Sequence, residues 1–213
     1  MIQSMPSKSK IARLLLFVTL LCTLPGAFGA TVASDYVGGG TTFNFADATG
    51  WFFTPSGSIS VTALGYYDLG TPGLADPHDV GIFLANGTPV VSVTIPSGTA
   101  ATFVPGTVGG TRFVSITPVL LTGGMQYYIE ADNNLTDQYV FGTGAVTYAV
   151  GITWNGYGDS NSNSIFDTVS NGGGVPGNLG PNFQFNAAVP EPGSVVPMLF
   201  AIAALGLRRL RRK

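Results

Sequence analysis

Between residues 31 and 188, short runs of apolar and β-branched residues alternate with polar residues and are separated by Gly, Pro, Asn and Asp. A period of two residues is typical of strands with one buried face, and the separating residues favour turns. The pattern predicts strands near residues 41–45, 51–54, 58–67, 80–84, 90–95, 112–117, 126–131, 139–141, 145–154, 164–168 and 182–187.

The strongest local signal is a hairpin over residues 79–95. Asn86 and Gly87 stand between two apolar runs, and this pair favours the positive φ angles of a tight turn. No helical period of useful length occurs between residues 31 and 188, and parallel strands would need long crossover connections. The sequence therefore predicts an all-β fold over residues 30–188, an antiparallel β-sandwich that is jelly-roll-like.

The order of segments within residues 58–155 resembles a β-sandwich module that recurs in exported bacterial proteins. After the hairpin, a strand over residues 113–121 contains Pro118, a turn follows at Gly124, and the next strand carries Tyr127 and Tyr128. The resemblance implies a sandwich fold and display outside the cytoplasm, and it implies no catalytic residues.

The first 29 residues have the order of a secretory signal peptide, which predicts an N-terminal signal helix. Lys8, Lys10 and Arg13 precede an apolar run over residues 14–24, and small residues follow. Eleven apolar residues are too few to span a bilayer, which needs about 20. We expect cleavage after Gly29, or one residue later at Ala30.

The only cysteine, Cys22, lies in this leader. A lipoprotein signal would have a small residue before the cysteine, and Leu21 stands there instead, so lipidation is disfavoured. Removal of the leader leaves a mature chain that owes nothing to disulfides.

Charge is distributed unevenly along the 213 residues. Eight of the nine Lys and Arg residues lie at the two ends, whereas ten of the eleven acidic residues lie between positions 35 and 167. Only Arg112 offsets these ten acids, so the middle carries a net charge of −9 with its histidine neutral. Nucleic-acid binding is disfavoured because it requires clustered Lys and Arg.

The last 25 residues contain three elements in a fixed order. Pro190, Glu191 and Pro192 come first, an almost wholly apolar segment covers residues 195–207, and a basic cluster ends the chain: Arg208, Arg209, Arg211, Arg212 and Lys213. This segment, residues 189–213, resembles the PEP-CTERM sorting signal. The resemblance implies processing by an exosortase-type enzyme, transient anchoring in the inner membrane through a C-terminal hydrophobic helix, and delivery to the cell surface or extracellular matrix.

The physics of the tail agrees with a transient anchor. A helix over residues 193–207 would reach about 22 Å, against a hydrocarbon core of about 30 Å. Positive charge is retained on the cytoplasmic side, so the basic cluster should stay inside and the domain should lie outside. An ordinary C-terminal anchor or a buried apolar helix is the alternative, but it leaves the position of the Pro-Glu-Pro motif unexplained.

Two sets of residues are candidates for chemistry or metal binding. His78 is flanked by Asp76 and Asp79, but a solvated turn before a strand is the favoured interpretation. A candidate calcium loop places oxygen side chains at alternate positions, in Asp159, Asn161 and Asn163. Ser164 and Ser170 replace its expected glycine and bidentate carboxylate, so a polar hairpin loop is favoured, and no metal or other cofactor is predicted.

Aromatic residues supply a candidate glycan-binding face. In the pairs Tyr66–Tyr67 and Tyr127–Tyr128, alternation along a strand sends one ring of each pair outward, where it could stack on a sugar. Glycoside hydrolysis would need two paired carboxylates, but acids such as Glu130, Asp132 and Asp137 are expected in solvated turns or at strand ends.

The sequence thus divides into a signal peptide (1–29), a β-sandwich domain (30–188) and a sorting segment (189–213). The leading hypothesis is a non-enzymatic protein of the cell surface or of an exopolysaccharide or biofilm matrix. The alternative is a carbohydrate-binding module of the same matrix, with extracellular polysaccharide as its partner. An exported hydrolase is disfavoured because no catalytic constellation is evident.

Overall fold

A computed structural model describes residues 29–44, 46–70, 72–133, 135–142, 146–160, 165, 170–172 and 179–188. All regular elements in these residues are β-strands, and every pair of neighbouring strands is antiparallel. The all-β, antiparallel prediction is therefore confirmed. Within the described ranges, no helix is long and apolar enough to cross a membrane. The expected signal helix and C-terminal hydrophobic helix fall outside these residues.

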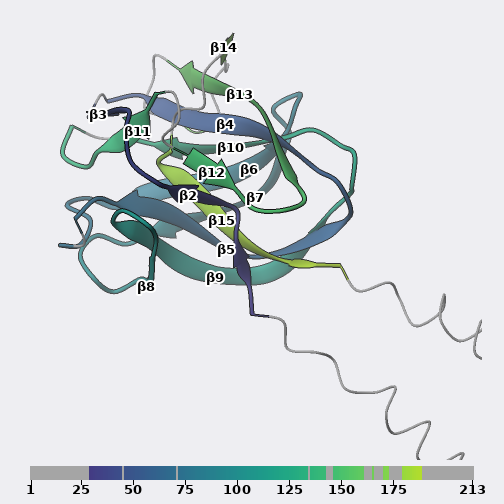
Figure 1. Cartoon of the computed structure of the whole chain (residues 1–213), viewed down its shortest axis with the longest axis horizontal. Helices are drawn as coiled ribbons and strands as arrows, with labels where there is room; N and C mark the ends of the chain where they lie inside the picture. Colours follow the sequence, from purple (N-terminus) through teal and green to yellow (C-terminus); the bar gives the residue numbers. More distant parts are fainter. Residues whose placement is uncertain are drawn as a thin grey trace, which may run out of the picture.

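Most strands belong to two sheets. The first sheet has the order β1 (Thr31–Val32), β15 (Pro181–Ala187), β5 (Ile59–Asp68), β9 (Gly110–Leu121) and β8 (Thr102–Pro105). The second has the order β14 (Ser170–Gly172), β13 (Ile152–Ser160), β4 (Ala48–Pro55), β10 (Tyr127–Asp132), β6 (His78–Leu84) and β7 (Pro89–Ile95). In Figure 1 the second sheet lies above the first.

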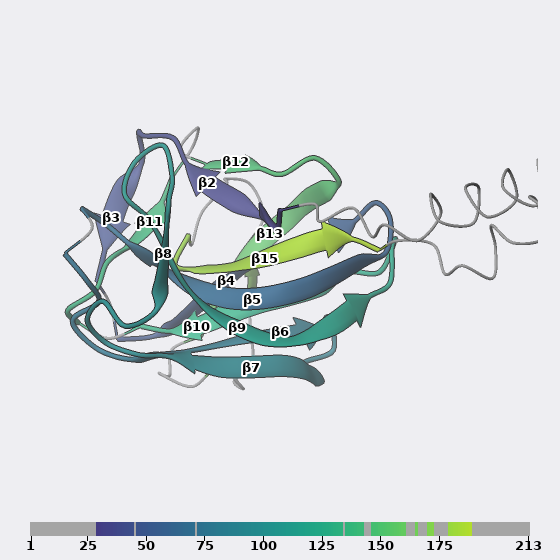
Figure 2. The same cartoon turned by 90° about the horizontal axis from the view of Figure 1, so that it is seen from below.

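Two short strand pairs flank these sheets. One pairs β3 (Thr41–Phe43) with β11 (Tyr139–Phe141), and the other pairs β2 (Ser34–Tyr36) with β12 (Val146–Tyr148). Figure 2 shows the β3–β11 pair at one end of the molecule and the β2–β12 pair along one side.

The predicted hairpin is confirmed. β6 and β7 pair antiparallel, and Gly87 has a φ of 85°, which glycine adopts without strain. The prediction of a single strand over residues 145–154 is wrong. It is two strands, β12 and β13, because the chain turns at Gly151, which has a φ of 91°. The strand expected over residues 164–168 falls almost wholly outside the described residues.

The two larger sheets enclose one hydrophobic core, and aromatic rings form its centre. Trp51 and Phe53 come from β4 and Phe183 from β15, with ring centroids 4.8–5.8 Å apart. The indole nitrogen of Trp51 donates a hydrogen bond to the backbone carbonyl of Pro181 at 3.0 Å, so the polar group of the buried ring is satisfied. The core therefore links the last strand of the domain to the opposite sheet.

The first and last strands of the domain are neighbours. Thr31 on β1 pairs with Phe185 on β15, and the amide of Ala188 donates to the carbonyl of Ser58 at 3.0 Å. The chain therefore enters and leaves the domain at the same end.

A buried ion pair ties β5 to β9. The Arg112 Nε donates to Asp68 Oδ2 at 2.7 Å, and both side chains are almost fully buried. Asp68 Oδ2 also accepts from the amide of Gly73 at 3.1 Å, and the guanidinium lies 5.2 Å from the centre of the Phe103 ring. These partners pair the two charges within the domain.

We expect Asp68→Asn to lower the free energy of unfolding by about 3–5 kcal/mol, because it leaves Arg112 buried without its carboxylate. Replacing both residues, by Asp68→Leu with Arg112→Met, should restore most of that loss. Urea denaturation of the two variants measures both effects. Asp79→Asn is the control, since Asp79 is exposed; a loss as large as that of Asp68→Asn would show that the ion pair has no special role.

Candidate functional site

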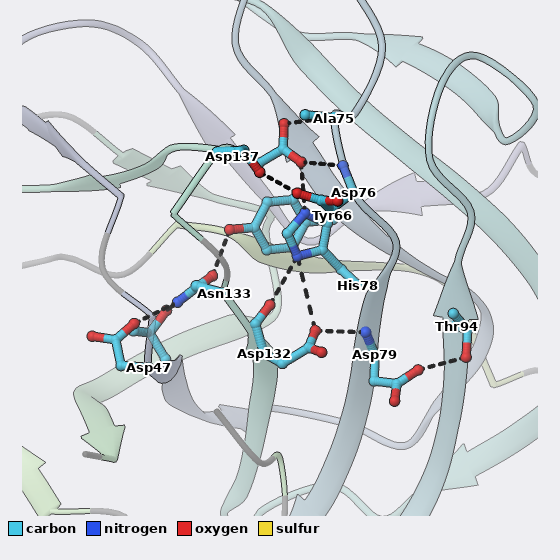
Figure 3. Close-up of polar contacts among 12 residues, drawn as sticks. Asp47, Tyr66, Ala75, Asp76, His78, Asp79, Thr94, Asp132, Asn133 and Asp137 are labelled. Carbon is cyan, nitrogen blue, oxygen red and sulfur yellow. Dashed lines mark hydrogen bonds and ion pairs between the residues drawn. The ribbon is translucent and has the colours of Figure 1, made fainter. Parts of the chain in front are cut away.

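The chain's only histidine lies in a buried polar cluster at one end of the domain (Figure 3). Tyr66 comes from β5, His78 begins β6 and Asp132 ends β10. Asn133 and Asp137 follow β10 in the chain. Along β5, Tyr66 pairs with the first residue of β15 whereas Ile59 pairs with the last. The cluster is therefore at the opposite end of the domain from the points where the chain enters and leaves.

His78 is completely buried and stacks on Tyr66. The two ring centroids are 3.7 Å apart and the planes differ by 1°. Nδ1 lies 2.8 Å from the backbone carbonyl of Asp132 and Nε2 lies 3.0 Å from Asp137 Oδ2. Because a carbonyl only accepts, Nδ1 must donate. A hydrogen bond between Nε2 and Asp137 therefore needs a second ring proton, which makes the contact an ion pair, or a proton on the carboxyl group.

Asp137 holds the segment before β6 in place. Its carboxylate accepts hydrogen bonds from the amides of Ala75 at 2.9 Å and Asp76 at 3.0 Å, in addition to the contact with His78. Burial alone would raise the pKa of Asp137, but the hydrogen bonds from His78 and the two amides outweigh it and hold the pKa below its usual value.

Asn133 joins the cluster to β4. Its side-chain nitrogen donates to Asp47 Oδ1 at 3.0 Å and to Thr49 Oγ1 at 2.8 Å, and its oxygen accepts from the Tyr66 hydroxyl. Burial raises the pKa of Asp47, of Asp132 and of the Tyr66 hydroxyl, since each would be charged in a partly dry environment.

The polar groups of the cluster bind one another and the backbone of the domain itself. Both nitrogens of His78 are engaged, its ring is covered by Tyr66, and the acids around it bind backbone amides and side chains of the domain itself. The arrangement can fix loops, but it does not present the imidazole to an external molecule. The prediction that His78 lies in a solvated turn is wrong, because the residue is buried and begins β6.

Two further predictions about acids and metals can be compared with the structure. Glu130, expected in a solvated position, is buried within β10. No group of three or more His, Cys, Asp or Glu among the described residues is arranged to hold a metal ion. Of the candidate calcium ligands, Asp159 lies near the end of β13, while Asn161 and Asn163 fall outside the described residues.

The four tyrosines proposed as a stacking face are all buried. Alternation does place Tyr66 and Tyr127 in the core between the sheets. Tyr67 and Tyr128 belong to other clusters, in which Tyr36 packs edge-on against Tyr67, and Phe52 and Ile165 pack with Tyr128. The expectation that one ring of each pair is exposed is therefore wrong, because further side chains cover the sides of the sheets that face away from the main core.

The expected cleavage position lies immediately before the first strand. Gly29 and Ala30 are exposed, and β1 begins at Thr31. The sorting residues Pro190, Glu191 and Pro192 and the basic cluster over 208–213 fall outside the described residues.

At this end of the domain, residues 188–213 match the PEP-CTERM protein-sorting motif. A domain followed by such a motif is an exported protein whose C-terminal segment is held transiently in the membrane and processed by an exosortase. The resemblance read from the sequence is thereby confirmed. No curated protein sequence gives a significant match to the chain.

The Asp137 interactions predict a measurable pH dependence. We expect Asp137→Asn to lower the free energy of unfolding by about 2 kcal/mol near neutral pH, as loss of a hydrogen-bonded charged partner does. Because folding lowers the pKa of Asp137, its contribution is present above the unfolded pKa of 3.8 and is lost as the pH falls through the folded value.

The variant should therefore lose less stability than the parent as the pH falls from about 5 through the folded pKa, which lies below 3.8. Urea denaturation across this range measures the two slopes, with Asp79→Asn as the control because its carboxylate is exposed. Identical slopes for parent and Asp137→Asn would contradict the assignment.

Proposed function

We propose that this chain is a non-enzymatic protein of the cell surface or extracellular matrix, carried there by its C-terminal sorting motif. The observation that carries the proposal is the pairing of β1 with β15. It brings the leader junction and the sorting motif to one end of the domain, so that the remainder of the domain can project away from the membrane during processing.

The strand order supports a jelly-roll sandwich as the displayed unit. Consecutive neighbours in one sheet are β1, β15, β5 and β9, and in the other β4, β10, β6 and β7. The chain thus passes repeatedly from one sheet to the other, as the Greek-key connections of a jelly roll do. Such a scaffold is compatible with many functions, so the argument for function depends on the sites.

The buried cluster around His78 supports a non-enzymatic role. A general base must reach the proton that it abstracts, and His78 is completely buried with both nitrogens engaged. The carbohydrate-binding alternative was based on exposed tyrosine rings, and all four of these tyrosines are buried. Display is therefore the better supported of the two.

We expect replacement of Pro190, Glu191 and Pro192 by alanine to trap the protein at the inner membrane with its C-terminus uncut. Cell fractionation followed by mass spectrometry of the protein from its native host measures both properties. Ser194→Ala is the matched control and should be processed normally. Recovery of the triple variant in the matrix at the parental level and with the parental mass would contradict sorting through this motif.

The absence of catalysis is tested separately. Incubation of the exported protein with polysaccharide from its host should release no new reducing ends. Release of sugar that is abolished by substitution of one carboxylate would assign an enzyme instead, and the sorting result would still stand.

A further inference from the structure

The outer strands of the two larger sheets differ sharply in length. β1 has two residues, β8 has four and ends at Pro105, and three residues of β14 are described. Proteins commonly keep such strands short or place proline in them, because an unpaired edge invites pairing with another chain. β7 has seven residues and occupies the remaining edge. Among the described residues, the other long unpaired stretch is that of β9 beyond Phe113, where its pairing with β8 ends.

β7 also lacks the usual protection by charge. Its sequence is Pro-Val-Val-Ser-Val-Thr-Ile, in which most residues are β-branched and favour a strand. Pro89 and a bulge at Val90 interrupt only the start of the strand. In the described part of the chain, no strand pairs with β7 on the side away from β6, and Figure 2 shows it as the outermost strand of its sheet.

An apolar strip accompanies this open edge. Val90, Val91 and Val93 on β7 pack against the core but remain partly exposed. β7 contacts β9, where the same holds for Val114 and Ile116. The β9 strand contains Pro118, which lacks the amide that a further strand would need. The available backbone edge is therefore that of β7, with apolar side chains beside it.

The distribution of charged residues favours a second copy of this chain as the partner of β7. Two copies of a domain with ten acids and a single arginine repel one another over most approaches. Residues 80–129 are the exception, since their only charged residue is Arg112, which is buried against Asp68. The carboxylate of Asp79 on β6 accepts a hydrogen bond from Thr94, so one charge lies beside the end of β7. Two copies that meet over the middle of β7 avoid opposing like charges.

We propose that β7 is a self-association surface, on which β7 of a second copy pairs antiparallel about a two-fold axis. The second sheet then continues from one copy into the other. A two-fold axis normal to the sheet places one residue of β7 directly opposite its own copy, with Cα atoms about 4.5–5.5 Å apart. Disulfides form across Cα separations of about 4.4–6.8 Å, so a single cysteine at that position will cross-link the pair.

The experiment is a cysteine scan in the full-length chain. Cys22→Ser removes the only native thiol, and Val91→Cys, Ser92→Cys, Val93→Cys or Thr94→Cys is then added singly. After export and mild oxidation, non-reducing electrophoresis measures the covalent dimer. One position should cross-link at least about tenfold more than the control, because pairing raises the effective concentration of the two thiols.

The yield of covalent dimer should fall sharply on either side of that position. Each step of one residue away from the axis moves the two equivalent cysteines apart by about 6.8 Å along the strand. Thr153→Cys is the matched control, because Thr153 is an exposed strand residue on β13 of the same sheet. A flat profile, no dimer at any β7 position, or equal dimer at Thr153 overturns the proposal. So does a mixed disulfide with a different protein, which would make that protein the occupant.

Discussion

The domain depends on the insertion of its last strand between two earlier ones. β15 lies between β1 and β5, and its Phe183 packs against Trp51 and Phe53 of the opposite sheet. Residues 30–188 contain no cysteine, so noncovalent packing alone holds this arrangement. Burial of large aromatic side chains supplies much of that stability, about 1.5–3 kcal/mol for each ring fully removed from water.

The two ends of the domain have different chemical character as a result. At one end, β1 and β15 connect the domain to the leader and to the sorting motif. At the other, Tyr66, His78, Asn133 and Asp137 form a hydrogen-bonded cluster that fixes the loops. Polar groups in such a cluster are costly to bury unless all are satisfied, which explains why its members contact one another so completely.

The features that could be predicted from the sequence are those encoded locally. The 79–95 hairpin, most strands and the C-terminal motif were predictable, because alternation, Asn86-Gly87 and Pro-Glu-Pro are each visible within a few residues. The break at Gly151 was missed because the apolar pattern continues across it. β1 and β8 were missed because strands of two and four residues leave almost no pattern.

Burial by distant parts of the chain was not predictable. Alternation gave the correct direction for Tyr67 and Tyr128, but the covering residues, such as Tyr36 and Ile165, lie more than thirty positions away. The same holds for His78, whose partners Asp132 and Asp137 are 54 and 59 residues distant. No period or motif relates positions so far apart, so only the folded arrangement reveals the cluster.

The position of β15 in the chain also means that the first sheet is completed last during export. An exported chain emerges from its first residue to its last, so β1 and β5 reach the outside before the strand that must lie between them. β15 ends at Ala187, and the sorting motif begins at the next residue, whose amide is still hydrogen-bonded to Ser58. A tail held transiently in the bilayer therefore keeps the domain tethered while β15 inserts between β1 and β5 and completes the first sheet.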